Sequence, residues 1–153
     1  QADFNLPDRL EAEYIGEDGA KHKPVMMHRA ILGSSEKFIR ILIENYSGKL
    51  PLWLAPVQLS ILTVTEEVND YALSLKQKFE EINLRVELDN RNEKIGYKIR
   101  EHSNAKVPLM AVIGKDEMSA ETISIRNLSK NATNTYIIKE AVSLLKKESE
   151  SPK

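Results

Sequence analysis

The segment that decides the predicted fold is LDNRNEKIGYKIREH, residues 88–102. It begins as a strand that ends at Asp89 and Asn90, residue types that readily turn the chain and cap helices. A short helix is expected to follow, because Ile95 and Ile99 lie four residues apart and can bury one helical face together. Four basic residues lie in and around this helix: Arg91, Lys94, Lys98 and Arg100.

The pattern alone leaves two interpretations of this basic helix open. Lys94 and Lys98 are expected to share a different face from the one that Ile95 and Ile99 bury. A basic helix that directly follows a strand, with the Asn92 amide and a carboxylate beside it, is suited to binding a polyanion or recognising base edges. The plainer alternative is a solvated charged face on an amphipathic helix, and the pattern by itself favours it.

Strands and helices alternate regularly around this segment. Four segments have the pattern of strands: 58–64, 84–88, 107–114 and 121–127. Helices are expected after Thr65, in the basic segment, and at the apolar stripe that ends with Leu145. Residues 129–134 are expected to form a polar loop, and the 121–127 strand is expected to lie at the sheet edge. We therefore predict an α/β domain with a mixed five-stranded sheet and three helices.

The beginning of the chain has a different pattern. Residues 9–15 alternate apolar and polar side chains as in a half-buried strand, residues 16–19 form a turn, and an apolar strand follows Pro24. A helix that contains Phe38 and ends at Gly48 completes a strand–strand–helix unit. Such a unit is too small to bury a stable core by itself.

A turn-forming linker at residues 47–51 divides the chain into two predicted domains, residues 1–48 and 49–153. The net charge of −1 means that any polyanion site must be a local patch. The sequence contains no cysteine, which excludes disulfides and thiolate ligands within it. Because the sequence begins with Gln1 and not with methionine, we expect a fragment of a longer protein.

No apolar run approaches the roughly 20 residues of a membrane span. The first residues also lack the basic and apolar regions of a signal peptide. We therefore expect a cytoplasmic protein that does not enter a membrane.

Motifs for catalysis or cofactor binding are sparse. The glycines form neither a dinucleotide-binding motif nor a P-loop, and no nucleophile–base pair is evident after residue 50. His28 lies in an apolar strand, where it is either a hydrogen-bonded core residue or a metal ligand without convincing partners. His102 is expected to be packed or hydrogen bonded. Ser34 and Lys37 open a helix where a phosphate could bind, although most such sites are plain helix caps.

Three stretches resemble one family of class II aminoacyl-tRNA synthetases. HRAILGSSEKF (28–38) is similar to the third conserved motif of that class, and its leading histidine resembles the form found in threonyl-tRNA synthetases. PLWLAPVQ (51–58) and residues 88–102 resemble the start and the centre of the anticodon-binding domain of the bacterial-type members. Histidyl-, prolyl- and glycyl-tRNA synthetases share this domain fold, but the combination of the three stretches points to threonine.

The resemblance implies that residues 1–48 are the end of a class II catalytic domain. In the family, the histidine at the position of His28 is one of three zinc ligands, and the other two lie outside this sequence. Ser34 would lie beside the adenylate, and Lys37 occupies the position of the usual ATP-binding arginine, whose planar fork a lysine cannot reproduce. Zinc and ATP with magnesium are therefore expected cofactors of the full-length enzyme. The fragment alone is expected to bind none of them and to be inactive.

The resemblance also gives the second domain a role in recognising the threonine tRNA. It implies that Asn92, Glu117 and Arg126 contact the second and third bases of the anticodon. An amide, a carboxylate and a guanidinium suit this task, because they match the donor and acceptor edges of bases. The predicted contacts to tRNA phosphates are Lys94, Lys98 and Arg100.

The predicted function is therefore part of a threonine–tRNA ligase. The full-length enzyme would activate threonine with ATP and transfer it to its tRNA, and it would act as a homodimer. The alternative is a non-catalytic tRNA- or nucleic-acid-binding paralogue that reuses the anticodon-binding domain. Lys37 is the residue that favours this alternative.

Overall fold

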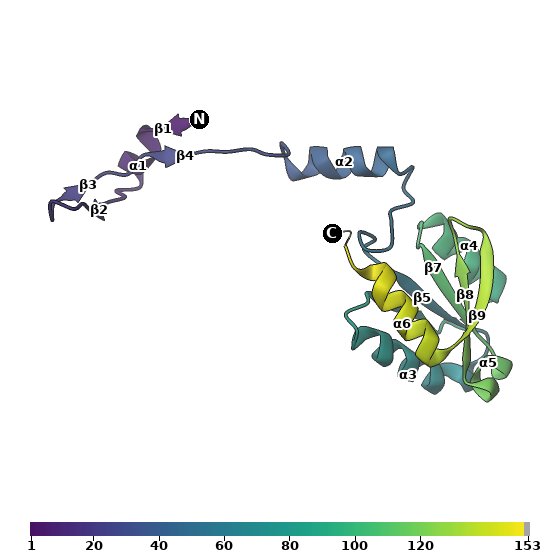
Figure 1. The fold of residues 1–153 in the computed structure, drawn as a ribbon. Coiled ribbons are helices and arrows are strands. Elements are labelled where there is room, and N and C mark those ends of the chain that lie inside the picture. The colour runs from purple at the N-terminus through teal and green to yellow at the C-terminus, as the bar shows by residue number, and fades with distance from the viewer. Residues whose placement is uncertain (152–153) are drawn as a thin grey trace. The chain divides into compact units, whose positions relative to one another are not determined.

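The computed structural model describes residues 1–151 of the chain. It contains two compact units, Gln1–Ile41 and Leu42–Lys153 (Figure 1). The buried apolar side chains that form the core extend from Ala55 to Leu145, so the core belongs to the larger unit.

A five-stranded sheet forms the centre of the larger unit, with the strand order β6–β5–β7–β8–β9. Its strands are β5 (Leu59–Thr63), β6 (Val86–Asp89), β7 (Leu109–Ile113), β8 (Thr122–Asn127) and β9 (Ala132–Ile137). The pairs of β5 with β6 and with β7 are parallel, whereas β8 pairs antiparallel with both β7 and β9. The sheet is therefore mixed and five-stranded, which confirms the predicted α/β fold.

Helices cover both faces of this sheet (Figure 1). They are η1 (Glu66–Val68), α3 (Asn69–Glu80), α4 (Ile95–Asn104), α5 (Lys115–Ala120) and α6 (Ile138–Ser149). Leu59 and Ile61 of β5 join the core cluster with Phe79 of α3 and Leu145 of α6. Ser60 of β5 faces the opposite way and contacts α4. The alternation along β5 thus separates an apolar face under α3 and α6 from a more polar face under α4.

Three details of the predicted domain were wrong. Up to residue 151 the domain has four α-helices and not three, because α5 forms directly after β7. Residues 129–134 are not all loop, since β9 begins at Ala132 after a turn in which Asn131 has a φ of 47°. Because β9 pairs outside β8, the 121–127 segment is not the sheet edge. The polar side chains of β9 are tolerated in a strand because most of them are exposed at that edge.

The smaller unit consists of short elements. It contains β1 (Ala2–Asp3), α1 (Asn5–Arg9), β2 (Tyr14–Ile15), β3 (Lys21–His22) and β4 (Met26–Met27). β1 pairs with β4 and β2 pairs with β3, both antiparallel. The predicted turn at 16–19 lies between β2 and β3.

The long strand predicted at 9–15 was wrong, because only Tyr14 and Ile15 of this segment belong to a strand, β2. The Asp3 carboxylate accepts the N–H groups of Asn5 and Leu6, both at 2.9 Å, which starts α1 instead. A φ of 52° at Glu11 then interrupts extended backbone before β2.

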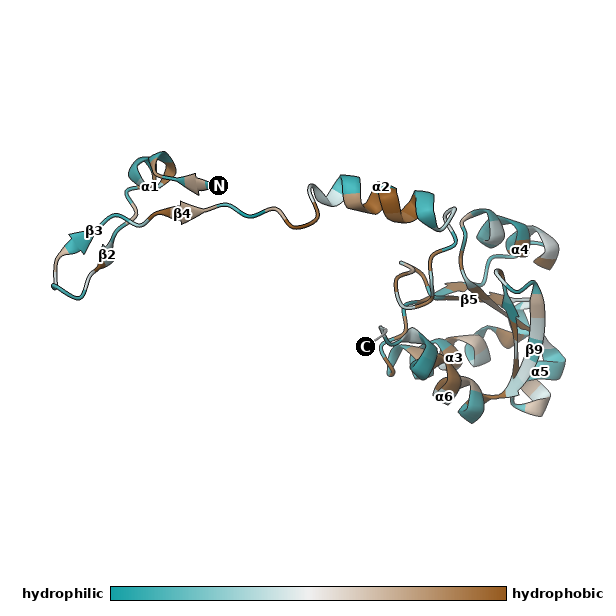
Figure 2. Ribbon diagram, turned by 45° about the horizontal axis from the view of Figure 1, so that its top comes forward, coloured by the Kyte–Doolittle hydropathy of each residue, from teal (hydrophilic) through white to brown (hydrophobic). Residues whose placement is uncertain are grey.

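The helix α2 (Ser35–Asn45) follows the prediction closely. It ends before Gly48, whose φ of 75° is favourable for glycine and stops a helix. Figure 2 shows an apolar stretch in this helix, and the side chains of Ile39, Ile41 and Ile43 are all at least half exposed.

Candidate nucleic-acid interface

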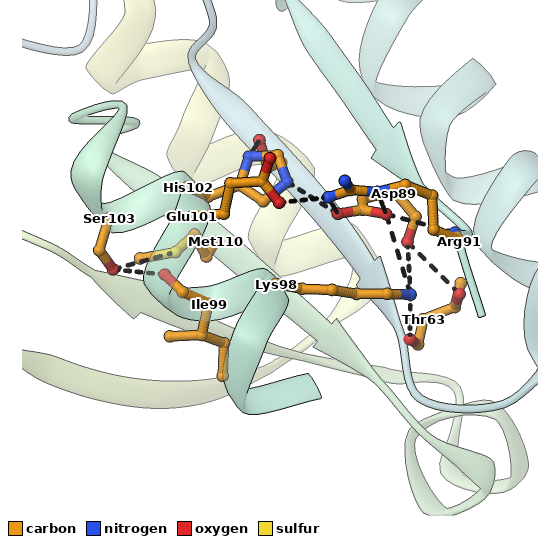
Figure 3. Close-up of polar contacts among 10 residues, drawn as sticks. Thr63, Asp89, Arg91, Lys98, Ile99, Glu101, His102, Ser103 and Met110 are labelled. Atoms are coloured by element: carbon orange, nitrogen blue, oxygen red, sulfur yellow. Dashed lines mark hydrogen bonds and ion pairs between the residues drawn. The ribbon is translucent and has the colours of Figure 1, made fainter. Parts of the chain in front are cut away.

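The end of β6 is organised by one buried carboxylate, that of Asp89 (Figure 3). Arg91 donates to it three times, from its backbone N–H at 3.2 Å, from Nε at 2.9 Å and from Nη2 at 2.7 Å. His102 Nε2 lies 3.0 Å from the same carboxylate. The Arg91 guanidinium, with help from His102, holds the pKa of Asp89 far below its usual range, although burial opposes the shift. These bonds therefore hold the segment after β6 against the end of the sheet.

Lys98 lies in the interior, with 1% of its surface exposed. Its Nζ donates to the backbone oxygens of Thr63 at 2.9 Å and Asp89 at 3.1 Å (Figure 3). Burial lowers the pKa of Lys98, and the nearby Asp89 carboxylate opposes this. The expectation that Lys98 shares an exposed charged face with Lys94 was wrong, because helical spacing places residues 95, 98, 99 and 102 on one face. A buried lysine in this position cannot contact a tRNA phosphate.

His102 completes this cluster from the next turn of α4. Its Nδ1 lies 3.1 Å from Ser60 Oγ and its Nε2 lies 3.0 Å from Asp89 Oδ2. The histidine is 7% exposed, so the predicted packed and hydrogen-bonded role is confirmed. A pocket of about 660 Å³ lies beside the cluster, with Arg91 and Glu101 in its wall.

The residues between β6 and α4 remain exposed. Asn92, Glu93 and Lys94 all lie on the surface, and α4 begins only at Ile95. Asn92 and Lys94 therefore belong to the loop that precedes the helix, not to the helix itself. Arg100 is exposed on α4, where it is available to a ligand.

Glu117 and Arg126 lie at the β8 end of the sheet face that α4 covers. Glu117 of α5 accepts the Gly114 N–H at 2.9 Å and the Ser124 hydroxyl at 3.0 Å. Arg126 is half-buried on β8, two residues beyond Ser124 and on the same face of the strand. Its Nη2 donates to Asn131 Oδ1 at 3.3 Å.

The strand register shows how Asp89 at the end of β6 is related to Ser124 on β8. Asp89 pairs with Leu62, Leu62 with Val112, and Val112 with Ser124, which forms one row across the sheet. Three steps between strands correspond to roughly 14 Å. The loop that carries Asn92 therefore starts at one polar end of this row, and Glu117 and Arg126 lie near its other polar end, with the apolar Leu62 and Val112 between the two ends. A single-stranded nucleic acid with unstacked bases could extend across such a distance.

The predicted site residues of the first unit do not form a comparable cluster. Ser34 Oγ accepts the Lys37 N–H at 3.3 Å, which is the plain helix cap considered as the alternative. His28 Nε2 lies 3.1 Å from Asp3 Oδ2, and the imidazole is half exposed.

No set of three or more His, Cys, Asp or Glu residues that could hold a metal occurs within residues 1–151. His28 and Asp3 alone do not make a zinc site, because zinc in proteins takes at least three protein ligands.

Sequence reasoning missed the importance of Asp89, which was treated as a turn residue. The signal was present in the helical spacing, because Lys98 and His102 are four residues apart on the face that must be buried. A lysine and a histidine on such a face require a buried acceptor, and Asp89 is the carboxylate that precedes them.

Comparisons with known proteins agree with the fold. Residues 58–148 match the family model described as the anticodon binding domain. The threonine–tRNA ligases of Parvibaculum lavamentivorans and Ehrlichia chaffeensis are 55% identical over 152 residues and 57% identical over 145 residues. These alignments cover 99% and 95% of this chain but 23% of each relative. The chain thus spans about a quarter of the length of these curated relatives.

A solved structure is also similar. The RNA-binding domain of a threonyl-tRNA synthetase from Cryptosporidium parvum Iowa II superimposes with a TM-score of 0.72 and 30% sequence identity. The match covers 97% of this chain and 38% of that one. In residues 1–151, none of the helices has the length and apolar character that crossing a bilayer requires.

Proposed function

The chain belongs to the anticodon-binding domain family, and on this basis we propose that it is the anticodon-binding part of a threonine–tRNA ligase. The observation that carries the proposal is the overlap between the family match at residues 58–148 and the sheet domain that carries Asn92 beside one edge strand and Glu117 and Arg126 three strands away. The relatives named threonine–tRNA ligase align over nearly the whole chain, which favours a ligase over a non-catalytic paralogue.

The threonine tRNA anticodon is the proposed ligand of the polar groups at the two ends of the row that crosses the sheet. Asn92, Glu117 and Arg126 contact its second and third bases, because all three lie at or beside the sheet face under α4 and are at least partly accessible. The Glu117 carboxylate has lone pairs beyond the two that Gly114 and Ser124 use, so it can still accept from a base. The exposed Lys94 and Arg100 bind phosphates.

The parent protein activates threonine with ATP and magnesium, uses zinc to select threonine, and works as a homodimer in the cytoplasm. In this proposal residues 1–48 are the end of its catalytic domain, with His28 as a zinc ligand and with Ser34 and Lys37 beside ATP. The 153-residue chain is inactive by itself, because the remaining zinc ligands and ATP-binding residues are not in it. Threonine-dependent ATP–pyrophosphate exchange by this chain would contradict that expectation.

Binding to an anticodon stem-loop of the threonine tRNA tests the proposed recognition. The competitors are stem-loops in which the second or the third anticodon base is changed, and the salt is about 0.1 M to screen non-specific attraction. We expect the cognate loop to bind roughly tenfold or more tightly than either competitor, since one lost base contact costs about 1–3 kcal/mol. Equal binding of all loops would reject the proposal.

Variants then assign the contacts. Arg126→Ala and Asn92→Ala are each expected to abolish the preference at one base. Lys76→Ala is the matched control, because Lys76 pairs with Glu80 on α3, which covers the other face of the sheet. A loss of preference in this control variant as well would show that the effect is not specific to the proposed contact residues.

A further inference from the structure

We propose that Arg91 is a positioning residue for base recognition, which ties the loop of residues 90–94 to the sheet and to α4 and so holds Asn92 in place for the anticodon. This inference rests on the proposed function, and it adds a residue that makes no base contact itself. Arg91 is half exposed and adjacent to Asn92, so its charge alone would suggest a phosphate contact. Its hydrogen bonds indicate a different role.

The Arg91 side chain is directed at the protein (Figure 3). Nε and Nη2 form a two-pronged contact with Asp89, at 2.9 and 2.7 Å. Nη2 also donates to Glu101 Oε2 at 2.7 Å. These contacts use three of the five N–H donors that a guanidinium has. Arg91 thus connects the end of β6 to the second turn of α4, and the loop between them is held from both sides.

The anchor itself is fixed. Asp89 is 5% exposed, and Lys98 and His102 contact it from α4. Lys98 is bonded in turn to the end of β5, and His102 is bonded to Ser60 of the same strand. Because the Asp89 carboxylate has several partners in the interior, its position is fixed. The loop therefore adopts a conformation that keeps Arg91 in contact with it.

Arg91 is the last residue of the loop with side-chain contacts of this kind. Among the described residues, the side chains of Asn92, Glu93 and Lys94 make no hydrogen bond with the rest of the protein, and α4 has no side-chain N-cap at Lys94. One backbone bond within the loop runs from the Glu93 N–H to the Arg91 oxygen, at 2.9 Å, and the Lys94 oxygen accepts the N–H groups of Tyr97 and Lys98 at the start of α4, at 2.8 and 3.2 Å. On the side of β6, the direction of Asn92 therefore depends on Arg91.

Without Arg91 the loop would have to be ordered when tRNA binds, and this ordering would lower affinity for the base that Asn92 contacts. The preference for that base is expected to fall about fivefold in Arg91→Ala. The preference at the base contacted by Arg126 is expected to stay within twofold of the wild type. Arg91→Lys is expected to behave like Arg91→Ala, since a lysine keeps the charge but not the fork.

The test is a double-mutant cycle on the 153-residue chain with Arg91→Ala, Asn92→Ala and the combined variant. Each is measured against the cognate stem-loop and the loops with a changed second or third base. If Arg91 acts through Asn92, the combined variant matches Asn92→Ala alone. If Arg91 binds phosphate, Arg91→Ala weakens all loops equally, adds to the effect of Asn92→Ala and reduces the salt dependence, and the inference is overturned.

A second measurement separates this inference from the proposed function. Backbone ¹⁵N relaxation of residues 90–94 without RNA is expected to show a rigid loop in the wild type and a mobile one in Arg91→Ala. A wild-type loop as mobile as that of the variant overturns the inference, even when the wild type distinguishes the stem-loops. A wild type that binds all stem-loops equally rejects the proposed function, and the inference falls with it.

Discussion

The two sides of the candidate interface are built in different ways. On the α4 side, the buried Asp89 carboxylate collects Arg91, Lys98 and His102, so the polar groups there hold the chain together. On the α5 side, the half-buried Glu117 has two protein partners, and Arg126 has one bond of 3.3 Å to an exposed asparagine. A positive charge near a binding surface is therefore not necessarily available to the ligand. Lys98 is structural, whereas Arg126 remains accessible.

The largest effect is expected on the α4 side. Asp89→Asn leaves the buried Lys98 without its carboxylate and removes the charge that holds Arg91 and His102. The free energy of unfolding is expected to fall by about 3 kcal/mol, as for other broken buried ion pairs. Urea denaturation measures this loss. Glu117→Gln is the matched control on the α5 side, where about 1 kcal/mol is expected. Equal losses in the two variants would remove the distinction between the two sides.

The next effect concerns Lys98. Lys98→Met fills a similar volume but removes the Nζ donor from the backbone oxygens of Thr63 and Asp89, of which the latter keeps the Thr63 hydroxyl as a donor at 3.4 Å. The free energy of unfolding is expected to fall by about 2 kcal/mol. The affinity of the folded variant for the anticodon stem-loop is expected to stay unchanged. Arg100→Ala is the control, with a stability change within about 0.5 kcal/mol and weaker binding to every loop. Weaker binding by Lys98→Met with unchanged stability would restore Lys98 as a phosphate contact.

The stability of the α4 side is also expected to depend on pH through Asp89. The pKa of Asp89 is lowered on folding, chiefly by Arg91, so its contribution to stability is present above the ordinary carboxyl pKa and is lost as the pH falls through the lower folded value. The groups that face this carboxylate are Arg91, Lys98, His102 and Ser60, which acts through His102. The difference in urea midpoint between wild type and Asp89→Asn is expected to be constant from about pH 5 to 7 and to shrink below about pH 4. A difference that grows on acidification would contradict this assignment.

The smallest effect is expected at Ser124. Its hydroxyl lies 3.0 Å from both Glu117 Oε1 and Thr135 Oγ1 at an accessible part of the sheet. Ser124→Ala is expected to lower the free energy of unfolding by less than about 1 kcal/mol and to weaken the cognate stem-loop a fewfold, because Glu117 loses its orientation. Thermal denaturation and the stem-loop titration together check this. A loss of stability as large as that of Asp89→Asn would place the structural centre on the α5 side.

Much of the fold could be predicted from local sequence. The strands near 58–64, 84–88, 107–114 and 121–127 all exist, because apolar runs and period-two patterns record burial directly. The ranges α5 and β9 could not be predicted in the same way. α5 has six residues, too few for a helical periodicity, and it is stabilised by the Glu117 bond to the Gly114 N–H. The sequence of β9, ATNTYI, is polar because one edge of it faces solvent.

The candidate site also has features that could be predicted from local sequence and features that could not. The sequence alone determined the strands β5 to β8, the helices α2, α3, α4 and α6, and the motifs that the chain shares with a family, because these depend on neighbouring residues. Only the tertiary structure decided that Lys98 is buried, that Arg91 is directed at the protein and that Asp89 organises the end of β6. Those outcomes depend on partners distant along the chain, such as Ser60 and His102, which are 42 residues apart. A buried polar group takes whichever partner the packed fold brings to it, and the periodicity of one segment contains no information about that partner.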